Sequence, residues 1–156
     1  FFDVTTPKFK EKAIFLFDKE DQFRPEVQAY HKIVRKFKSK KKKLIITRES
    51  SSKPGYLSHQ YVELERKFKD FDSIQVCQYN PQLGLIPIEI SDIFPAAHHE
   101  TSRIDFDPKE FPTFEKTWKC FFDNNKFSEI HYDKNDKFLK YFVKILSKDI
   151  KKKSLV

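Results

Sequence analysis

YNPQLGLIPIEISDIFPAAHHE, residues 79–100, is the stretch from which the fold can be worked out. It contains Gly84, one of only two glycines in the 156-residue chain. Ser73–Gln78 (SIQVCQ), just before it, is typical of a strand, and Pro87 then opens a short apolar helical turn. A glycine at such a corner indicates a positive φ angle or close approach by another part of the chain. An ordinary tight turn followed by a helix packed on the sheet is the alternative interpretation.

Strands and helices alternate on both sides of this stretch. Apolar runs indicate strands, and apolar residues at three- and four-residue steps indicate helices. The predicted strands are 13–17, 44–47, 73–78 and 127–132, and the predicted helices are 25–37, 58–69, 113–123 and 136–148. With right-handed crossovers, this order predicts an α/β fold: a three-layer α/β/α sandwich with a parallel sheet of about four strands.

Length and charge restrict the class of protein. A chain of 156 residues predicts a single α/β domain over 1–156, with 1–10 and 150–156 as frayed termini. The net charge of +8 favours an anionic partner, with nucleic acid as the first candidate, although surface lysines also aid solubility.

Cys77 and Cys120 show no metal or disulfide spacing, so we expect a reducing, cytoplasmic environment. No membrane-span or signal-peptide pattern is found, and we expect no membrane partner, no metal and no cofactor.

The densest charge lies in RKFKSKKKK, residues 35–43, which closes the helix that begins at Pro25. Its cations are the candidate nucleic-acid-binding residues: Arg35, Lys36, Lys38, Lys40, Lys41, Lys42 and Lys43. Cations also stabilise a helix C-terminus by themselves, so a solvated helix end is the alternative. Like charges packed this densely repel one another, which favours an external anion. If they bind phosphates, affinity for tRNA should fall steeply with salt.

The second glycine, Gly55, lies in the loop RESSSKPGYLSHQY, residues 48–61. Its serines, Lys53 and the following helix N-terminus could bind phosphate, but the glycine spacing is not that of a Walker loop. Both glycine loops leave the carboxyl ends of consecutive predicted strands, so we expect them to line one crevice. The crevice would bring together Lys53, Ser58, His59, Asn80, His98 and His99.

Four segments, spread along nearly the whole chain, are informative together: RPEVQAYHKIVRKF (24–37), SSSKPGYLS (50–58), LGLIPIEISDIFPAAHHE (83–100) and FFDNNKFSEIHY (121–132). In the same order, they resemble the central domain of archaeosine synthase, an archaeal tRNA-modifying enzyme related to tRNA-guanine transglycosylase. The resemblance implies a fold like that of uracil-DNA glycosylases. It also implies a role in tRNA modification, in which lysine is joined to the nitrile of a deazaguanine base.

The family's first motif reads Pro-Cys, three residues, Lys-Pro-Tyr, two residues, Ser, two residues, His. Lys53, Pro54 and Ser58 match it, whereas Arg48 and Glu49 stand at the Pro-Cys positions. Gly55 stands at the Tyr position and Tyr61 at the final His position. A thiolate can add to a nitrile, and Glu49 cannot form the same adduct.

The second motif keeps Gly84, Pro87, Glu89, Pro95 and His98, with Ile88 where an Arg is usual. The resemblance therefore implies Lys53, Ser58, Glu89 and His98 as catalytic candidates. We expect Gly55, Gly84, Pro54 and Pro87 to shape the pocket. Each candidate also has a purely structural interpretation. Lys53 is typical of a solvated loop, and the His98–His99 pair is typical of a helix end. Glu89 is typical of an acidic residue on the surface.

Three functions are compatible with these residues. The first is an archaeosine-synthase-like transferase acting on the nitrile base in tRNA, as a stand-alone subunit with a transglycosylase-like, PUA-domain or radical-type partner protein. The second is a non-catalytic RNA-binding or assembly module of the same fold, which Glu49 favours. The third is a structural domain of a larger protein.

Trp118 could stack a base, but its helical spacing among phenylalanines favours the core.

Overall fold

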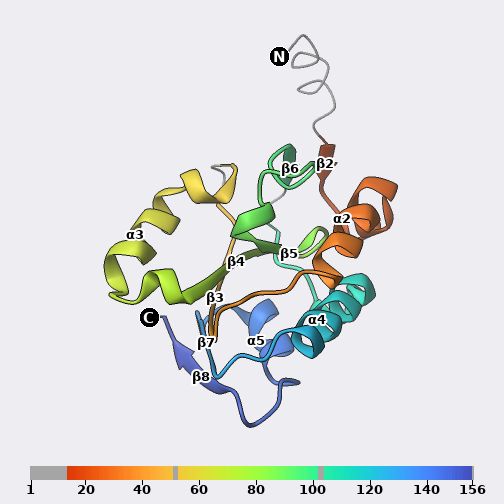
Figure 1. Cartoon of the computed structure of the whole chain (residues 1–156). Helices are drawn as coiled ribbons and strands as arrows, with labels where there is room; N and C mark the ends of the chain where they lie inside the picture. Colours follow the sequence, from red (N-terminus) through yellow and green to blue (C-terminus); the bar gives the residue numbers. More distant parts are fainter. Residues whose placement is uncertain (1–13, 51–52, 102–103, 156) are drawn as a thin grey trace.

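The computed structural model describes residues 14–50, 53–101 and 104–155, which form a mixed α/β fold (Figure 1). Within them, the main sheet has five strands in the order β5-β4-β3-β7-β8. They are β3 (Lys43–Arg48), β4 (Ile74–Asn80), β5 (Gly84–Pro87), β7 (Glu129–Tyr132) and β8 (Lys151–Ser154). Neighbouring strands are parallel except for β5, which is antiparallel to β4. A separate two-stranded parallel sheet pairs β2 (Ile14–Leu16) with β6 (His99–Thr101).

The described part of the chain has four α-helices, near the positions predicted from periodicity. They are α2 (Pro25–Arg35), α3 (His59–Lys67), α4 (Pro112–Asn124) and α5 (Lys137–Val143). Proline occupies the first helical turn of α2 and of α4, where its missing N–H costs nothing. The side chain of Ser58 caps α3, and the side chain of Asp136 caps α5.

Two apolar clusters lie on opposite faces of the main sheet. Because side chains alternate along a strand, Leu44 and Ile46 of β3 join one cluster and Ile45 joins the other. Helices α2, α4 and α5 contribute to the larger cluster and α3 to the smaller one, and Figure 1 shows α3 across the sheet from α2 and α4. Trp118 is 1% exposed among phenylalanines of α4 and α5, so it belongs to the core and is not a surface for a base.

The first predicted strand, 13–17, does not enter the main sheet. Residue 13 lies outside the described residues, and 14–16 form β2, which pairs with β6 instead. The partner β6 begins at His99, near the end of the stretch 79–100. The pairing therefore depends on where the long connection after β5 returns, which local periodicity does not determine.

The structure adds one strand and orders one predicted terminus. Gly84–Pro87 is the antiparallel edge strand β5, because the chain reverses at Gly84, and the helical turn predicted after Pro87 is present as a 3-10 turn at Ile88–Ile90. Residues 150–156 were expected to fray, but Lys151–Ser154 forms β8 because its backbone pairs with β7. Residues 1–10 lie outside the described residues.

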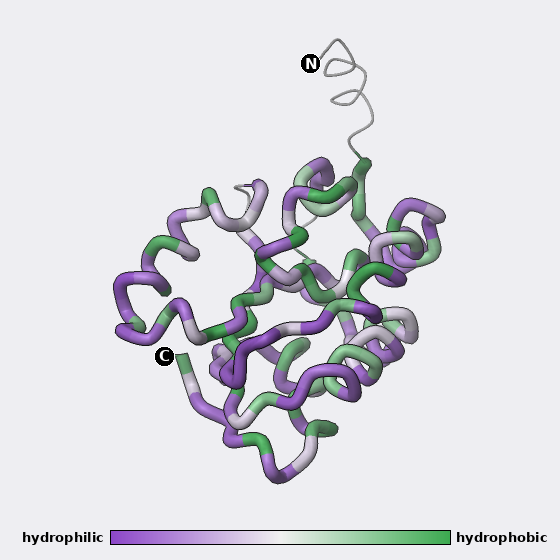
Figure 2. The backbone as a smooth tube through the Cα atoms, viewed as in Figure 1, coloured by the Kyte–Doolittle hydropathy of each residue, from purple (hydrophilic) through white to green (hydrophobic). Residues whose placement is uncertain are grey.

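Hydrophilic residues dominate the connector between α2 and β3 and most of the C-terminal strand (Figure 2). Within the described residues, the helices are too short or too polar to cross a membrane.

Candidate functional site

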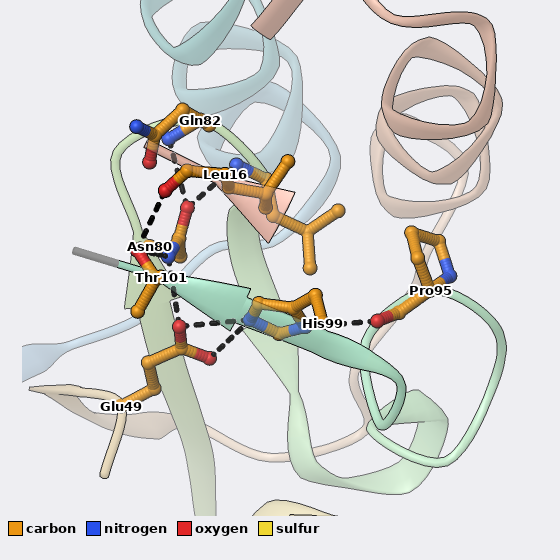
Figure 3. A network of polar contacts seen from close by, with 8 residues as sticks. Leu16, Glu49, Asn80, Gln82, Pro95, His99 and Thr101 are labelled. Atoms are coloured by element: carbon orange, nitrogen blue, oxygen red, sulfur yellow. Dashed lines mark hydrogen bonds and ion pairs between the residues drawn. The ribbon is translucent and has the colours of Figure 1, made fainter. Parts of the chain in front are cut away.

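A buried polar network lies at the carboxyl ends of β3 and β4 (Figure 3). Glu49 directly follows β3, and Asn80 is the last residue of β4. The parallel register places them side by side, and Nδ2 of Asn80 donates to Oε1 of Glu49 at 2.8 Å. His99, the first residue of β6, contributes Nε2 at 2.8 Å and 3.0 Å from the two carboxyl oxygens of Glu49. Three elements distant in sequence therefore meet at one point.

Glu49 and His99 share a proton. Nδ1 of His99 donates to the backbone carbonyl oxygen of Pro95 at 2.8 Å, because a carbonyl oxygen only accepts. The second contact, between Nε2 and the carboxyl group, then needs its own proton on one of the two partners. The side chains of His99 and Glu49 are only 0% and 4% exposed. Such a pair can exchange a proton with a bound substrate, and it also stabilises the fold by keeping both buried groups bonded.

Asn80 links the pair to the two-stranded sheet. Its Nδ2 also donates to the hydroxyl of Thr101 at 3.1 Å, and that hydroxyl donates to the carbonyl of Leu16 at 3.3 Å (Figure 3). Its Oδ1 accepts the backbone N–H groups of Gln82 and Leu83, both at 2.9 Å. The network therefore holds β2 and β6 against the end of the main sheet.

Gly84 shows both properties expected of a scarce glycine at a corner. Its φ is +92°, and a Cβ built on it would lie 2.4 Å from Cε1 of His31. The His31 ring cannot move away easily, because it is fully buried and bonded on both sides. Nε2 donates to the carbonyl of Gln82 at 2.9 Å, and Nδ1 accepts from the hydroxyl of Thr117 at 2.7 Å.

His31 should make the fold sensitive to acid. Burial, and to a smaller extent Arg35, lower the pKa of His31 to about 4, from an ordinary value of about 6.5. Neutral His31 therefore stabilises the fold fully above pH ~6.5, and this stabilisation, about 3 kcal/mol, is lost as the pH falls to ~4. Denaturant unfolding between pH 7 and 5 should show a steeper loss for the wild type than for His31→Gln, which has no group titrating there. Equal pH slopes would contradict this assignment.

The expected crevice is only partly present. Asn80 and His99 join the network, but Ser58 is fully buried and its hydroxyl donates to the carbonyl of Gly55 at 2.7 Å while capping α3. His59 is on the surface and pairs with Glu63 at 3.4 Å. The hydroxyl of Ser58 therefore bonds to nearby backbone groups of this turn and helix cap, and the exposed His59 does not join the network.

The two glycine corners lie at the same end of the main sheet, but side chains fill both of them. A Cβ on Gly55 would lie 2.3 Å from Oε1 of Gln78 in β4, whereas Gly84 packs on His31 of α2. Pro54 precedes the turn that starts at Gly55, and Pro87 pairs with Cys77 at the end of β5. These four predicted pocket-shaping residues therefore pack locally rather than facing one shared cavity.

The other catalytic candidates are dispersed. Lys53 is half-buried, and so is His98, whose ring centroid lies 6.1 Å from that of Phe94. Burial, and then the neighbouring His99, hold the pKa of His98 below its ordinary value. Glu89 is exposed and accepts from Nε2 of Gln75 at 2.7 Å, toward the amino end of β4. Because β5 runs antiparallel to β4, the chain carries Glu89 away from the network.

A pocket that sequence reasoning missed opens beyond β3 and β7. Its volume is about 650 Å³, and its walls include Arg48, the last residue of β3, and Asp133, the first residue after β7. The chain leaves β3 toward β4 on one side and returns to β7 on the other, so this is the topological switch point of the sheet. The available sequence signal was a charged residue directly after each of two predicted strands, 44–47 and 127–132.

Two residues of the pocket wall, Arg48 and Asp136, contact the buried side chain of Tyr79. The guanidinium of Arg48 lies 5.9 Å from the ring centroid of Tyr79, and the Tyr79 hydroxyl donates to Oδ2 of Asp136. Burial, and then Asp136, raise the pKa of Tyr79 above its ordinary value, so the hydroxyl remains a donor. Across the described ranges, no group of three His, Cys, Asp or Glu side chains is placed to hold a metal ion.

The predicted nucleic-acid-binding run lies at the opposite end of the sheet. It precedes β3, at the amino ends of the parallel strands. Arg35 donates to the hydroxyl of Thr117 at 3.2 Å, and Lys43 pairs with Asp70 at 2.9 Å. The lysines at 36, 38, 40 and 42 are exposed, and Lys41 is half-buried.

Fold and site together define a mixed α/β protein with a buried carboxyl–imidazole pair at the carboxyl end of its sheet. Comparison of the chain with protein-family models, with curated proteins and with solved structures finds no match.

Proposed function

We propose that this chain is a tRNA-modification protein resembling the central domain of archaeosine synthase, and that it acts as a non-catalytic RNA-binding module. The observation that carries the proposal is the state of Glu49. It stands where the resemblance expects a nucleophilic cysteine, and its carboxyl group is buried and bonded to His99 and Asn80. A carboxyl group held in this way cannot replace a thiolate that adds to a nitrile.

The placement of the other candidates supports the same conclusion. The hydroxyl of Ser58 caps a helix, and Glu89 lies toward the other end of β4. A transferase needs its groups within reach of one reacting atom, and this set does not meet that requirement. The exposed lysines before β3 and the net charge of +8 remain suited to RNA.

The proposal includes the finer fold that the resemblance implies, a three-layer α/β/α sandwich of the uracil-DNA-glycosylase type. Its support is the parallel set β4-β3-β7-β8 with apolar clusters on both faces. Fold alone does not determine activity, which depends on the residues at the site.

A single incubation tests the proposed function. The chain is mixed with tRNA that carries the nitrile base and with lysine, and both tRNA retention and nucleoside mass are measured. We expect retained tRNA and an unchanged nucleoside mass. A lysine adduct would contradict the non-catalytic assignment, and failure to retain tRNA would contradict the RNA-binding one.

The transferase is the second candidate, and the shared proton between Glu49 and His99 favours it, because such a pair can act as a general acid or base. The incubation is therefore repeated with a transglycosylase-like, PUA-domain or radical-type partner protein present. An adduct formed by the wild type and lost in Glu49→Gln would establish this candidate.

A further inference from the structure

The basic connector between α2 and β3 is held in place along its length. Nδ2 of Asn124 donates to the carbonyl of Arg35 at 2.7 Å. Nδ2 of Asn125 donates to the carbonyl of Phe37 at 2.9 Å, and its Oδ1 accepts the N–H of Ser39 at 2.6 Å. These bonds use the connector's backbone, and the side chains of Lys36, Lys38, Lys40 and Lys42 are exposed. A dense run of like charge is thereby kept in one conformation.

The C-terminal strand joins the same surface. The backbone N–H of Ser128 donates to the carbonyl of Lys42 at 2.7 Å, and the N–H of Lys151 donates to the carbonyl of Ser128 at 3.0 Å. Lys42 and Lys151, more than a hundred residues apart in the chain, are therefore separated by about two strand spacings, roughly 10 Å. Lys126 lies between them in sequence and follows Asn125, which holds the connector.

We define the cationic ledge as Lys36, Lys38, Lys40, Lys42, Lys126 and Lys151, all of which are exposed. Within the described residues, none of these six lysines forms an ion pair with a carboxylate. Their neighbours differ: Lys43 pairs with Asp70 at 2.9 Å, and Lys153 pairs with Glu129 at 3.6 Å. The ledge therefore concentrates the uncompensated positive charge on this side of the molecule.

Fixing like charges close together raises the free energy of the isolated protein, and an external polyanion removes this penalty. Because the connector is already ordered, binding does not have to immobilise its backbone. Phe37, the aromatic residue of the connector, is half-buried and stacks on Phe121 with ring centroids 6.2 Å apart. The ledge thus offers charge without an exposed ring for a base.

We propose that the cationic ledge binds the phosphodiester backbone of folded RNA, independently of base sequence, and so positions the RNA across the amino end of the sheet. This inference rests on the proposed function and specifies its binding face. Contacts of this kind set the register of a nucleic acid without reading its bases.

The test compares two variants with the same loss of charge. The ledge variant carries Lys42→Gln, Lys126→Gln and Lys151→Gln. The control carries Lys109→Gln, Lys116→Gln and Lys140→Gln, three exposed lysines outside the ledge. Dissociation constants for unmodified tRNA and for an unrelated RNA hairpin are measured from 50 to 200 mM salt.

We expect the ledge variant to bind both RNAs roughly 10- to 100-fold more weakly, with a salt slope reduced by about 2 to 3, as for three lost phosphate contacts. The control should stay within about threefold of the wild type, because distant exposed charges are screened. The ledge variant should also unfold at a temperature no lower than the wild type, which separates lost binding from lost folding.

The outcomes distinguish the two claims. A wild type that binds neither RNA would overturn the proposed function. A wild type that binds, with both variants weakened equally, would overturn the ledge and leave the RNA-binding function standing. Displacement of bound tRNA by polyglutamate at matched charge concentration would also overturn the ledge's assignment to RNA, since an acidic protein partner would then fit it equally well.

Discussion

Gly84→Ala is expected to destabilise the protein by about 3 to 5 kcal/mol, among the larger effects of a single substitution. Two costs add. The φ of +92° is unfavourable for any residue with a Cβ, and that Cβ would lie 2.4 Å from the His31 ring. The ring is fixed from both sides by Gln82 and Thr117, so relaxation is restricted. Urea unfolding of the variant and the wild type measures the difference.

Gly55→Ala is the matched control. Its Cβ would also meet a neighbour, at 2.3 Å, but that neighbour is the far end of the flexible Gln78 side chain. No positive φ applies at this position, so we expect a smaller loss, about 1 to 2 kcal/mol. A Gly84→Ala variant that is no less stable than Gly55→Ala would show that the backbone at Gly84 is not constrained in this way.

Glu49→Ala is the second substitution expected to have a large effect, about 3 to 5 kcal/mol. The cost comes from what remains: His99 Nε2 would stay buried without its partner, and Asn80 Nδ2 would keep only its bond to the Thr101 hydroxyl. Glu49→Gln should cost less, roughly 1 to 2 kcal/mol, because its amide can still accept from Asn80 and donate to a neutral His99.

A double-mutant cycle isolates the pair. Unfolding free energies are measured for Glu49→Ala, for His99→Ala and for the combined variant. We expect the combined loss to be smaller than the sum of the single losses by more than ~1 kcal/mol, because each single variant leaves one buried group unbonded. Strict additivity would mean that the carboxyl group and the imidazole do not depend on each other.

Local signals were sufficient for much of the fold. Proline at the first turn, followed by apolar residues at three- and four-residue steps, predicted α2 and α4 close to their observed ends. The scarcity of glycine correctly singled out Gly84, with its positive φ and its close neighbour. The helices and the positive φ depend on side-chain spacing and backbone sterics over a few residues, whereas the neighbour of Gly84 is His31 from the distant helix α2.

The site depended more heavily on long-range packing. Sequence reasoning placed Asn80 and His99 near each other. It considered Glu49 only as the residue that replaces the cysteine of the family motif, and it did not predict the contact with His99. The resemblance also implied Glu89 as a catalytic candidate with His98, although the antiparallel direction of β5 carries Glu89 away from the network. Residues 81–83 are too few for a parallel crossover, so they force β5 to turn back along β4. The sequence reasoning missed this reversal because it did not assign Gly84–Pro87 to a strand.

By itself, the sequence determined the helices, the buried phenylalanine-rich core and the corner at Gly84, because side-chain period and backbone sterics act over a few residues. The tertiary structure alone decided that β2 pairs with β6, that Glu49 meets His99 fifty residues away, and that Lys151 comes close to Lys42. Each of these depends on strand register and on where long connections return. Such contacts form only when distant segments bury their apolar faces together.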